Sequence, residues 1–436
     1  MKLHNIKGYA WIVVGLSSFL LIDKYIMNVS PSLIANELMS SFSINATEMS
    51  AMVSLFLWSV VFCQFFVAGP IIDKLGFRKV SFFSLILSAI GLLLFVLSAD
   101  IHSFALGCVS RLMIGIGASF ATVGYIKAAA VWFDPRKFAF VCSFLMTAAM
   151  TGALLGQVPL VYLIELTGSW HRALISYACF SIVIALLYLA LVRDYNPDAS
   201  YSNQTKGNTG TLAGIKKVLL NKNNWYLTLY TGLTFTTIDV FGGIWGNNYF
   251  RELYSIPAKD ASYIVSMMFL GLAIGSPIIG KLSEKFDNRV GIMVAFHIIA
   301  TISLAVVLQF KLTPTISGVL LFVFGFCLGV YMLAFAIGNR INPVVVAATV
   351  AALINTGEPL LGALFDPLIG HLLDLTWTGQ YIDAQNHISA IASEGAHRYF
   401  HINAYHHAFL ILVFSMIVSF FLLILVKDKE VNKNET

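Results

Sequence analysis

Three carboxyl side chains interrupt long apolar stretches of the sequence. Asp23, Asp239 and Glu358 each lie within a mostly apolar run of about 20 residues, the length that crosses the hydrocarbon core of a bilayer. An ionisable side chain at this depth costs about 2.5 to 3.5 kcal/mol on insertion scales, so it usually faces a partner or a water-filled cavity. Loss of water favours the protonated carboxyl group, whereas a nearby cation favours the charged form. These residues could therefore bind and release protons in response to a bound solute.

The three acids are predicted to lie at one depth. Counted from the cytoplasmic end of each predicted span they are 15, 14 and 14 residues in, or roughly 21 to 23 Å at 1.5 Å per residue. We predict that Glu358 and Asp239 are proton-coupling groups and that Asp23 is a third such group or a salt-bridge partner. For each acid, the alternative is a buried structural ion pair.

Three basic residues also fall inside spans. Arg111 could pair with Asp239, hold a solute carboxylate through two parallel hydrogen bonds, or pack helices together. Lys127 is near the inner end of its span and could extend to the lipid headgroups. Lys24 follows Asp23, and neighbours on a helix point about 100° apart, so the two do not simply neutralise each other. The predicted solute-binding set is Lys24, Arg111, Lys127, Tyr25, Asn28, Gln157, Trp245, Asn247, Tyr331 and Asn355, each of which could instead form an interhelical hydrogen bond.

The composition is that of an all-α integral membrane protein. The 436 residues are 58% apolar and 11% charged, against roughly 25% charged in soluble domains. The five cysteines lie far apart inside apolar runs, so neither a disulfide framework nor a metal site is expected, and no cofactor motif is present. Twelve transmembrane helices are predicted, at 8–33, 49–72, 80–97, 104–131, 138–166, 173–191, 225–250, 261–279, 290–308, 315–337, 344–373 and 408–426.

The basic residues predict the orientation in the membrane. Of 27 Lys and Arg residues, 19 fall on the side that holds both predicted termini, five fall on the opposite side and three lie inside spans. The positive-inside rule then places both termini in the cytoplasm, which suits a multi-pass protein of a bacterial inner membrane. The net charge of +5 reflects this distribution rather than a nucleic-acid partner. The first apolar run is not followed by a cleavage site, so we expect it to be a retained span rather than a signal peptide.

Two internal matches relate the halves of the chain. The first gate motif follows the second span and contains Gly69, Asp73, Lys74, Gly76, Arg78 and Lys79. The second gate motif follows the eighth span and repeats the spacing with Gly280, Glu284, Lys285 and Arg289, although Asp287 replaces the second glycine. GLSSFLLID in the first span also matches GLTFTTID in the seventh. These repeats predict two pseudo-symmetric six-helix bundles, 1–193 and 225–436, joined by a cytoplasmic linker, 194–224.

The gate motif resembles the major facilitator superfamily signature G-x-x-x-D-[RK]-x-G-x-[RK]-[RK]. Arg111 to Gly117 is similar to the family's R-x-x-x-G-x-G element, and Gly152 to Pro159 is similar to its glycine motif in helix 5. The resemblance implies the major facilitator fold, with helices 1, 4, 7 and 10 around a central cavity and helix 11 beside it. It also implies that Asp73 complements the N-terminus of helix 11, after Pro343, in one state of an alternating-access cycle. Phe77 departs from the arginine of many members.

The region around the eleventh span narrows the resemblance. Gly362 to Asp374, followed by an extended outer loop, is similar to the branch that contains lysosomal dipeptide transporters and nutrient transporters of intracellular bacteria. This resemblance implies amino acids or small peptides as solutes. In the outer loop, His397 and His401 have the i, i+4 spacing of metal ligands on one helical face, but we expect solvated histidines there.

The function predicted from these features is proton-coupled secondary transport of a small polar solute, such as an amino acid or short peptide, most simply import by a monomer. The alternative is export or import of a siderophore, an organic anion or a drug-like compound, because one fold supports many functions. An enzyme is not expected, since the sequence contains no phosphate-binding loop, H-E-x-x-H or G-x-S-x-G motif. A receptor that does not transport would be expected to lack the duplicated gate. The partners are the solute, protons and the lipid bilayer.

Overall fold

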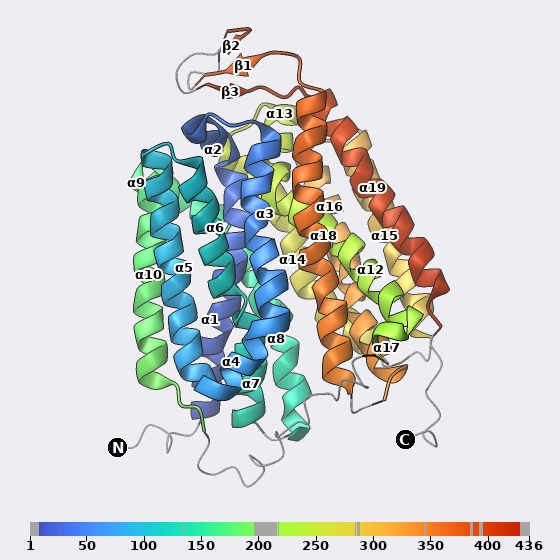
Figure 1. Cartoon of the computed structure of the whole chain (residues 1–436). Helices are drawn as coiled ribbons and strands as arrows, with labels where there is room; N and C mark the ends of the chain where they lie inside the picture. The colour runs from blue at the N-terminus through green and yellow to red at the C-terminus, as the bar shows by residue number, and fades with distance from the viewer. Residues whose placement is uncertain are drawn as a thin grey trace. The chain divides into compact units, whose positions relative to one another are not determined.

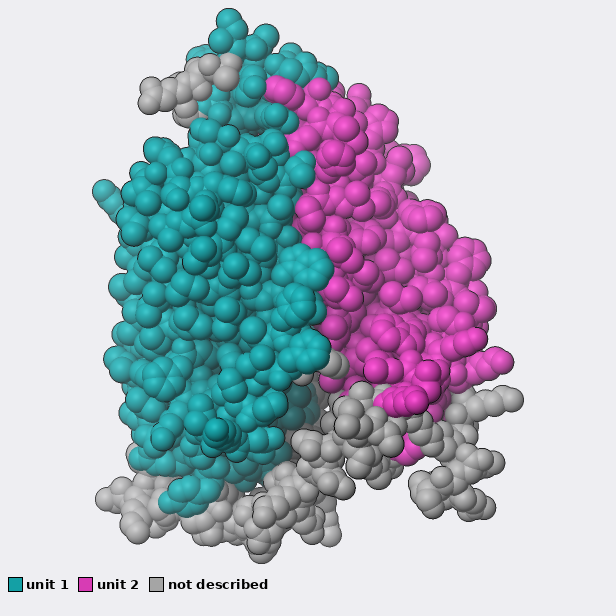
Figure 2. All heavy atoms as spheres, viewed as in Figure 1, with its two compact units in different colours: residues 1–206, 378–399 teal, residues 207–377, 400–436 magenta. Residues whose placement is uncertain are grey.

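The computed structural model describes nearly the whole chain as helix (Figure 1). The described residues are 8–133, 135–195, 216, 218–283, 285, 288–343, 346–383, 387–391 and 396–427. They separate into two compact units: unit 1 comprises Met1–Lys206 and Thr378–Tyr399, and unit 2 comprises Gly207–Trp377 and Phe400–Thr436, coloured teal and magenta in Figure 2. Most of the predicted linker lies outside the described residues, but residues 216 and 218–220 are helical.

Unit 1 contains six helical stretches that match the first six predicted spans. Several are built from more than one helix because the chain bends within the membrane. The elements are α1 (Tyr9–Val29) with η2 (Ser30–Leu33), the short α2 (Ala35–Phe42), α3 (Ala46–Cys63) with the π-helical η3 (Gln64–Ala68) and α4 (Gly69–Leu75), α5 (Phe77–Asp100), α6 (Phe104–Ala118) with α7 (Ala121–Trp132), α8 (Pro135–Leu155) with α9 (Val158–Thr167), and α10 (Trp170–Leu191).

Unit 2 contains the other six stretches. Its first span is broken by an eight-residue π-helix, η5. The elements are α12 (Lys222–Thr237) with η5 (Ile238–Trp245) and α13 (Gly246–Tyr254), α14 (Ala258–Ser283), α15 (Arg289–Gln309), α16 (Pro314–Leu328) with η6 (Gly329–Met332) and α17 (Leu333–Arg340), α18 (Ala347–Leu375), and α19 (Ile402–Leu425).

Polar side chains distinguish two of the twelve stretches from the rest. Ten described helical stretches are long and apolar enough to cross a membrane by length and composition alone. The other two are the η5-containing span, which carries Asp239 and begins with the threonine-rich α12, and α18, which carries Glu358. These two stretches hold the two acids of unit 2 that are predicted to couple protons.

Short polar side chains begin many of the helices. Asn45 accepts a hydrogen bond from the main-chain N–H of Glu48 at the start of α3, and the Glu48 carboxylate accepts from the main-chain N–H of Asn45. This reciprocal capping box satisfies two donors that a helix N-terminus otherwise leaves unpaired. Asn288 caps α15 and Thr313 caps α16 in the same general way.

The outer loop after α18 forms a small antiparallel sheet. Its strands are β1 (Tyr381–Ile382), β2 (Ile388–Ser389) and β3 (His397–Arg398), in the order β2-β1-β3. Strand β3 packs on α2, so the loop groups with unit 1, whereas the sequence had placed it with the second bundle. The pattern of spans could not reveal this grouping, because it depends on a contact between segments that are distant in the sequence.

Candidate functional site

The irregular part of the seventh span carries two predicted site residues. Asp239 lies in the first turn of η5 and Trp245 is its last residue, and both side chains are buried. A π-helix is rare and marks functional sites more often than chance, because its wider turn redirects side chains. The indole N–H of Trp245 has no hydrogen-bond acceptor among the residues that the structure describes, and its ring packs against Phe400 and Tyr405. Asn247 follows η5 and is buried as well.

Tyr331 brings the two predicted proton-coupling groups of unit 2 into one neighbourhood. Its side chain is 2% exposed, and both Asp239 and Glu358 lie within electrostatic range of its hydroxyl group. These three side chains come from η5, η6 and α18, which are far apart in the sequence. The ring of Phe235 lies 5.4 Å from the Tyr331 ring, measured between centroids. Unit 2 therefore holds these two acids and a buried tyrosine in one neighbourhood, on elements that are far apart in the sequence.

Helices α12 and α18 cross closely beside Glu358. A Cβ atom on Gly232 of α12 would lie 2.5 Å from the carbonyl oxygen of Gly357, and one on Gly357 would collide with the carbonyl oxygen of Thr228. Thr231 also donates a hydrogen bond to the carbonyl oxygen of Ile354 at 3.1 Å. Small residues allow membrane helices to approach closely enough for such contacts. The crossing places α18 directly against α12, one residue before Glu358.

Unit 1 binds Asp23 differently from the acids of unit 2. One carboxylate oxygen accepts hydrogen bonds from the Tyr177 hydroxyl at 2.8 Å and from the Ser181 hydroxyl at 3.0 Å, both on α10. The side chain is 2% exposed, and no described cation forms a salt bridge with it. Of the roles predicted for Asp23, the salt-bridge partner is therefore not seen in the described part of the chain. Tyr177 and Ser181 were missed because a lone hydroxyl in an apolar span gives no sequence signal.

Arg111 binds main-chain carbonyl groups inside unit 1. It donates to Met27 O at 3.1 Å and to Val53 O at 3.3 Å, and its guanidinium lies over the ring of Phe56 at 5.1 Å. The side chain is 2% exposed. Met27 is near the end of α1, where carbonyl groups lose their helical partners. Among the roles considered for Arg111, these contacts support helix packing.

The remaining predicted site residues of unit 1 lie near the end of α1. Lys24 is buried, and its ammonium lies 5.5 Å from the centroid of the Tyr25 ring, a cation–π distance. Asn28 is half-buried one turn further on. Gln157, fully buried at the break between α8 and α9, donates to the Ser32 hydroxyl at 3.0 Å. In unit 2, Asn355 is half-buried on α18.

The first gate motif contains an ion pair that the sequence did not predict. The ammonium of Lys127, on α7, lies 2.7 Å from Oδ1 of Asp73, on α4. Lys127 had been predicted to bind solute or lipid headgroups, but in the structure it contacts the gate acid. Their side chains are 30% and 58% exposed, so water weakens the attraction. This pair joins the gate motif to the inner end of the fourth span.

We expect the two residues of this pair to be only weakly coupled in stability. In a double-mutant cycle of Asp73→Asn and Lys127→Met, the coupling in unfolding free energy should be about 0.2 to 1 kcal/mol. Unfolding of the four proteins in detergent, followed by tryptophan fluorescence, gives this number. A coupling above that range would mean that the pair is shielded from water.

Asp194, which follows α10, contacts the first gate motif, and the sequence did not predict this contact. Its carboxylate accepts a hydrogen bond from the main-chain N–H of Arg78 at 2.7 Å, in the first turn of α5. In return the Arg78 guanidinium donates to the Leu189 carbonyl oxygen at 2.9 and 2.6 Å, in the last turn of α10. Each charge thus satisfies unpaired main-chain groups at one helix end and complements its dipole. Lys74 and Lys79 of the motif are exposed.

The glycine between α4 and α5 makes room for that carboxylate. Gly76 has φ +84°, and an added Cβ would lie 2.6 Å from Cγ of Asp194. We expect Gly76→Ala to lower the unfolding free energy by about 1 to 3 kcal/mol through backbone strain, with a further cost from the collision. Gly168→Ala is the matched control, because Gly168 has φ +69° but open space around it. Equal losses for the two variants, measured by thermal unfolding, would contradict a close contact at Gly76.

The second gate motif is described only in part. Gly280 lies near the end of α14, Lys285 is exposed, and Arg289 begins α15. Glu284, the counterpart of Asp73, lies outside the described residues.

The histidines of the outer loop do not share a helical face. His397 lies in β3, and His401 is the N-cap residue of α19, so their spacing of four is not a helical turn. Within the described residues no group of three or more His, Cys, Asp or Glu side chains is placed to hold a metal ion.

A histidine inside the ninth span was also missed. His297 is 1% exposed, and its Nε2 lies 2.9 Å from the carbonyl oxygen of Met416 and 3.2 Å from the Ser419 hydroxyl. Both partners lie on α19, so His297 joins α15 to α19. The rule that an ionisable group inside a span needs a partner would have found it, as it found the acids.

Comparisons with known proteins point to one family. The family model described as Major Facilitator Superfamily matches residues 13–365. The "Uncharacterized transporter YybO" of Bacillus subtilis (strain 168) is 22% identical over 402 residues, which are 84% of this chain and 88% of that protein. The "Lysosomal dipeptide transporter MFSD1" of Mus musculus is 23% identical over 315 residues, which are 69% of this chain and 66% of that protein.

Two solved structures are similar in fold. An inward-facing, unoccupied bacterial homologue of the human lysosomal transporter Spinster superposes with a TM-score of 0.71 at 14% identity, and the match covers 97% of this chain and 96% of that one. The nucleoside transporter NupG superposes with a TM-score of 0.71 at 12% identity, covering 95% of this chain and 99% of that one. At these identities the likeness concerns the fold.

Proposed function

Because the chain belongs to the major facilitator superfamily, and is thus a multi-pass membrane transporter of small solutes rather than an enzyme, we propose that it imports an amino acid or short peptide together with protons. The observation that carries this proposal is the pair of acids, Asp239 and Glu358, within electrostatic range of one buried tyrosine, Tyr331. The relative named as a dipeptide transporter supports the solute class.

The proposed coupling follows from the cost of placing a charge inside the membrane. Low solvation favours the protonated form of a carboxyl group and a nearby cation favours the charged form, so the protonation of these acids responds to a cationic group of the solute. The ammonium group of a zwitterionic solute neutralises one acid of unit 2, and a proton neutralises the other. The protein then changes state easily only when it carries both solute and proton, or after it has released both, so that the two move in the same direction.

Uptake into liposomes tests this function. Purified protein is reconstituted, the interior is made alkaline, and labelled dialanine is added outside. We expect accumulation above the external concentration, and a protonophore should collapse it to equal concentrations. Protein-free liposomes are the control. Uptake that does not depend on the pH gradient would refute proton coupling. Uptake of an organic anion but of no amino acid or peptide would refute the proposed solute class.

We also propose a bacterial inner-membrane location, a monomeric state and cytoplasmic termini. The excess of basic residues on the side of both termini supports this orientation. A fluorescent protein fused to the C-terminus would fluoresce after membrane insertion only if that end is in the cytoplasm.

A further inference from the structure

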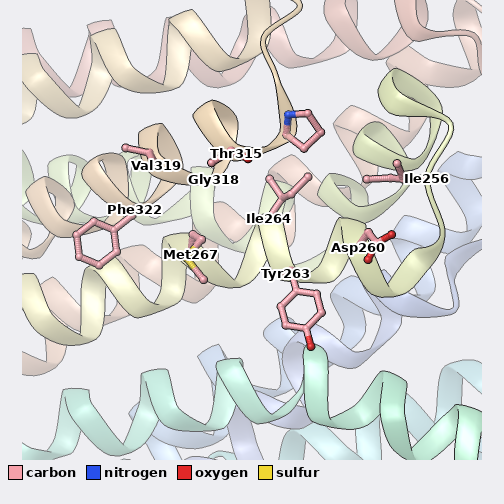
Figure 3. A pocket seen from close by; sticks show the side chains of 10 residues that line it. Ile256, Asp260, Tyr263, Ile264, Met267, Thr315, Gly318, Val319 and Phe322 are labelled. Carbon is pink, nitrogen blue, oxygen red and sulfur yellow. The ribbon is translucent and has the colours of Figure 1, made fainter.

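A groove lies between the ends of α14 and α16 in unit 2, on the side predicted to be outside. Its volume is about 540 Å³, and Figure 3 shows side chains of both helices along it. It is lined by Ile256, Asp260, Tyr263, Ile264, Met267, Pro314, Thr315, Gly318, Val319 and Phe322. Asp260 is the sole charged side chain among these ten.

The groove exists because two helices touch along one part of their length and separate along the next. Toward the middle of the membrane, a Cβ on Gly271 would collide with the Phe322 carbonyl oxygen, and one on Gly325 with the Met268 carbonyl oxygen. Near the outer end, an added Cβ on Gly318 would meet the nearest described atom only at 3.6 Å. These glycine contacts thus hold α14 and α16 together on the inner side of the groove. Toward the outer side, the two helices separate.

The open side of the groove faces an apolar surface. Tyr263 is 42% exposed and Val319 is 57% exposed, although both are large apolar side chains. Both α14 and the α16 stretch have the length and composition of membrane spans. A groove with exposed apolar walls on membrane-spanning helices is accessible to lipid chains.

A single acid lies at one end of the groove. In Figure 3, Asp260 and Ile256 are at one end and Phe322 is at the other. Asp260 is in the first turn of α14 and is exposed, and no described side chain forms an ion pair with it. A negative charge at one end of an apolar groove complements an amphipathic molecule that has a cationic head and a hydrocarbon tail.

We propose that this groove binds an acyl chain of a phospholipid whose headgroup carries a primary amine, with the ammonium group beside Asp260. From Asp260 to Met267 the wall extends roughly 10 Å along the helix, which accommodates the upper part of one chain. The ammonium of such a headgroup lies at the level where Asp260 ends the apolar wall. This lipid site is separate from the proposed solute-coupling acids and does not depend on them.

Native mass spectrometry of the purified full chain tests the proposal. The probes are dioleoyl phosphatidylethanolamine, which has the amine, and dioleoyl phosphatidylglycerol, which lacks it. Wild-type protein should retain one amine-headed lipid, with a preference of about two- to fivefold over phosphatidylglycerol, as expected for an exposed ion pair. Asp260→Asn should keep one bound lipid but lose the preference. Gly318→Phe, which fills the groove, should lose the retained lipid of either kind.

Two further measurements keep the outcome decisive. Ile302→Phe, on the exposed face of α15, is the matched control and should retain the lipid as the wild type does. Thermal unfolding shows whether Gly318→Phe remains folded, and if it does not, Asp260→Asn alone decides. Retention of the lipid by folded Gly318→Phe, or an unchanged preference in Asp260→Asn, would overturn the proposal.

Discussion

Replacing Glu358 with glutamine is expected to abolish accumulation of solute while exchange of labelled for unlabelled solute continues. Glutamine has nearly the shape of a protonated glutamic acid, but it cannot release a proton. The variant therefore behaves as if residue 358 were always protonated. Without proton release, the pH gradient cannot drive net uptake, and the internal concentration should only reach the external one. Asp239 is the other acid in the neighbourhood of Tyr331, so Asp239→Asn is also expected to impair accumulation.

Exchange and accumulation must be measured on the same liposomes. The matched control is Asp374→Asn, which removes a carboxyl group at the far end of α18. That variant should accumulate solute normally. If Glu358→Gln accumulated solute with an unchanged pH dependence, Glu358 would be a structural residue, and the coupling proposal would have to rest on Asp239 alone.

Adding one methyl group at Gly357 is expected to destabilise unit 2 strongly. A Cβ there would collide with the Thr228 carbonyl oxygen, and the facing position on α12 is Gly232, where the space is equally restricted. Backbone atoms cannot rotate away as a side chain can, so the two helices must move apart. Overpacking of this kind costs about 1 to 3 kcal/mol, and here the Thr231 hydrogen bond to Ile354 would be lost as well.

Thermal unfolding of Gly357→Ala in detergent measures this cost. Gly15→Ala is the matched control, because Gly15 is also a helical glycine but has no atom within 4 Å of an added Cβ. Alanine has the better helix propensity, so the control should be unchanged or slightly more stable. Wild-type stability of Gly357→Ala would show that α12 and α18 do not approach as closely as described.

The spans and the duplication could be predicted because both are local properties of the sequence. Each span needs only a run of apolar residues. Each copy of the gate motif is a short segment, so the spacing of the two copies can be compared directly. The height of Asp239 and Glu358 followed from counting, since helical rise is constant. For the same reason, the sequence located the two acids that the structure places near Tyr331.

The partners of the charged residues could not be predicted in this way. Asp23 binds Tyr177, which is 154 residues away, and Arg111 binds carbonyl groups at Met27 and Val53. Met27 lies near the end of α1, where carbonyl groups lose their helical partners, and the direction of a side chain depends on how each helix rotates about its axis. Neither property appears in hydropathy or spacing.

The sequence alone determined the number of membrane spans and the two related halves, and it predicted a common depth for the three acids, because these depend on residue type and position along one helix. Only the tertiary structure decided that Lys127 pairs with Asp73, that Asp194 caps α5, and that glycines bring α12 against α18. Those contacts join segments distant in the chain, and packing between helices selects them.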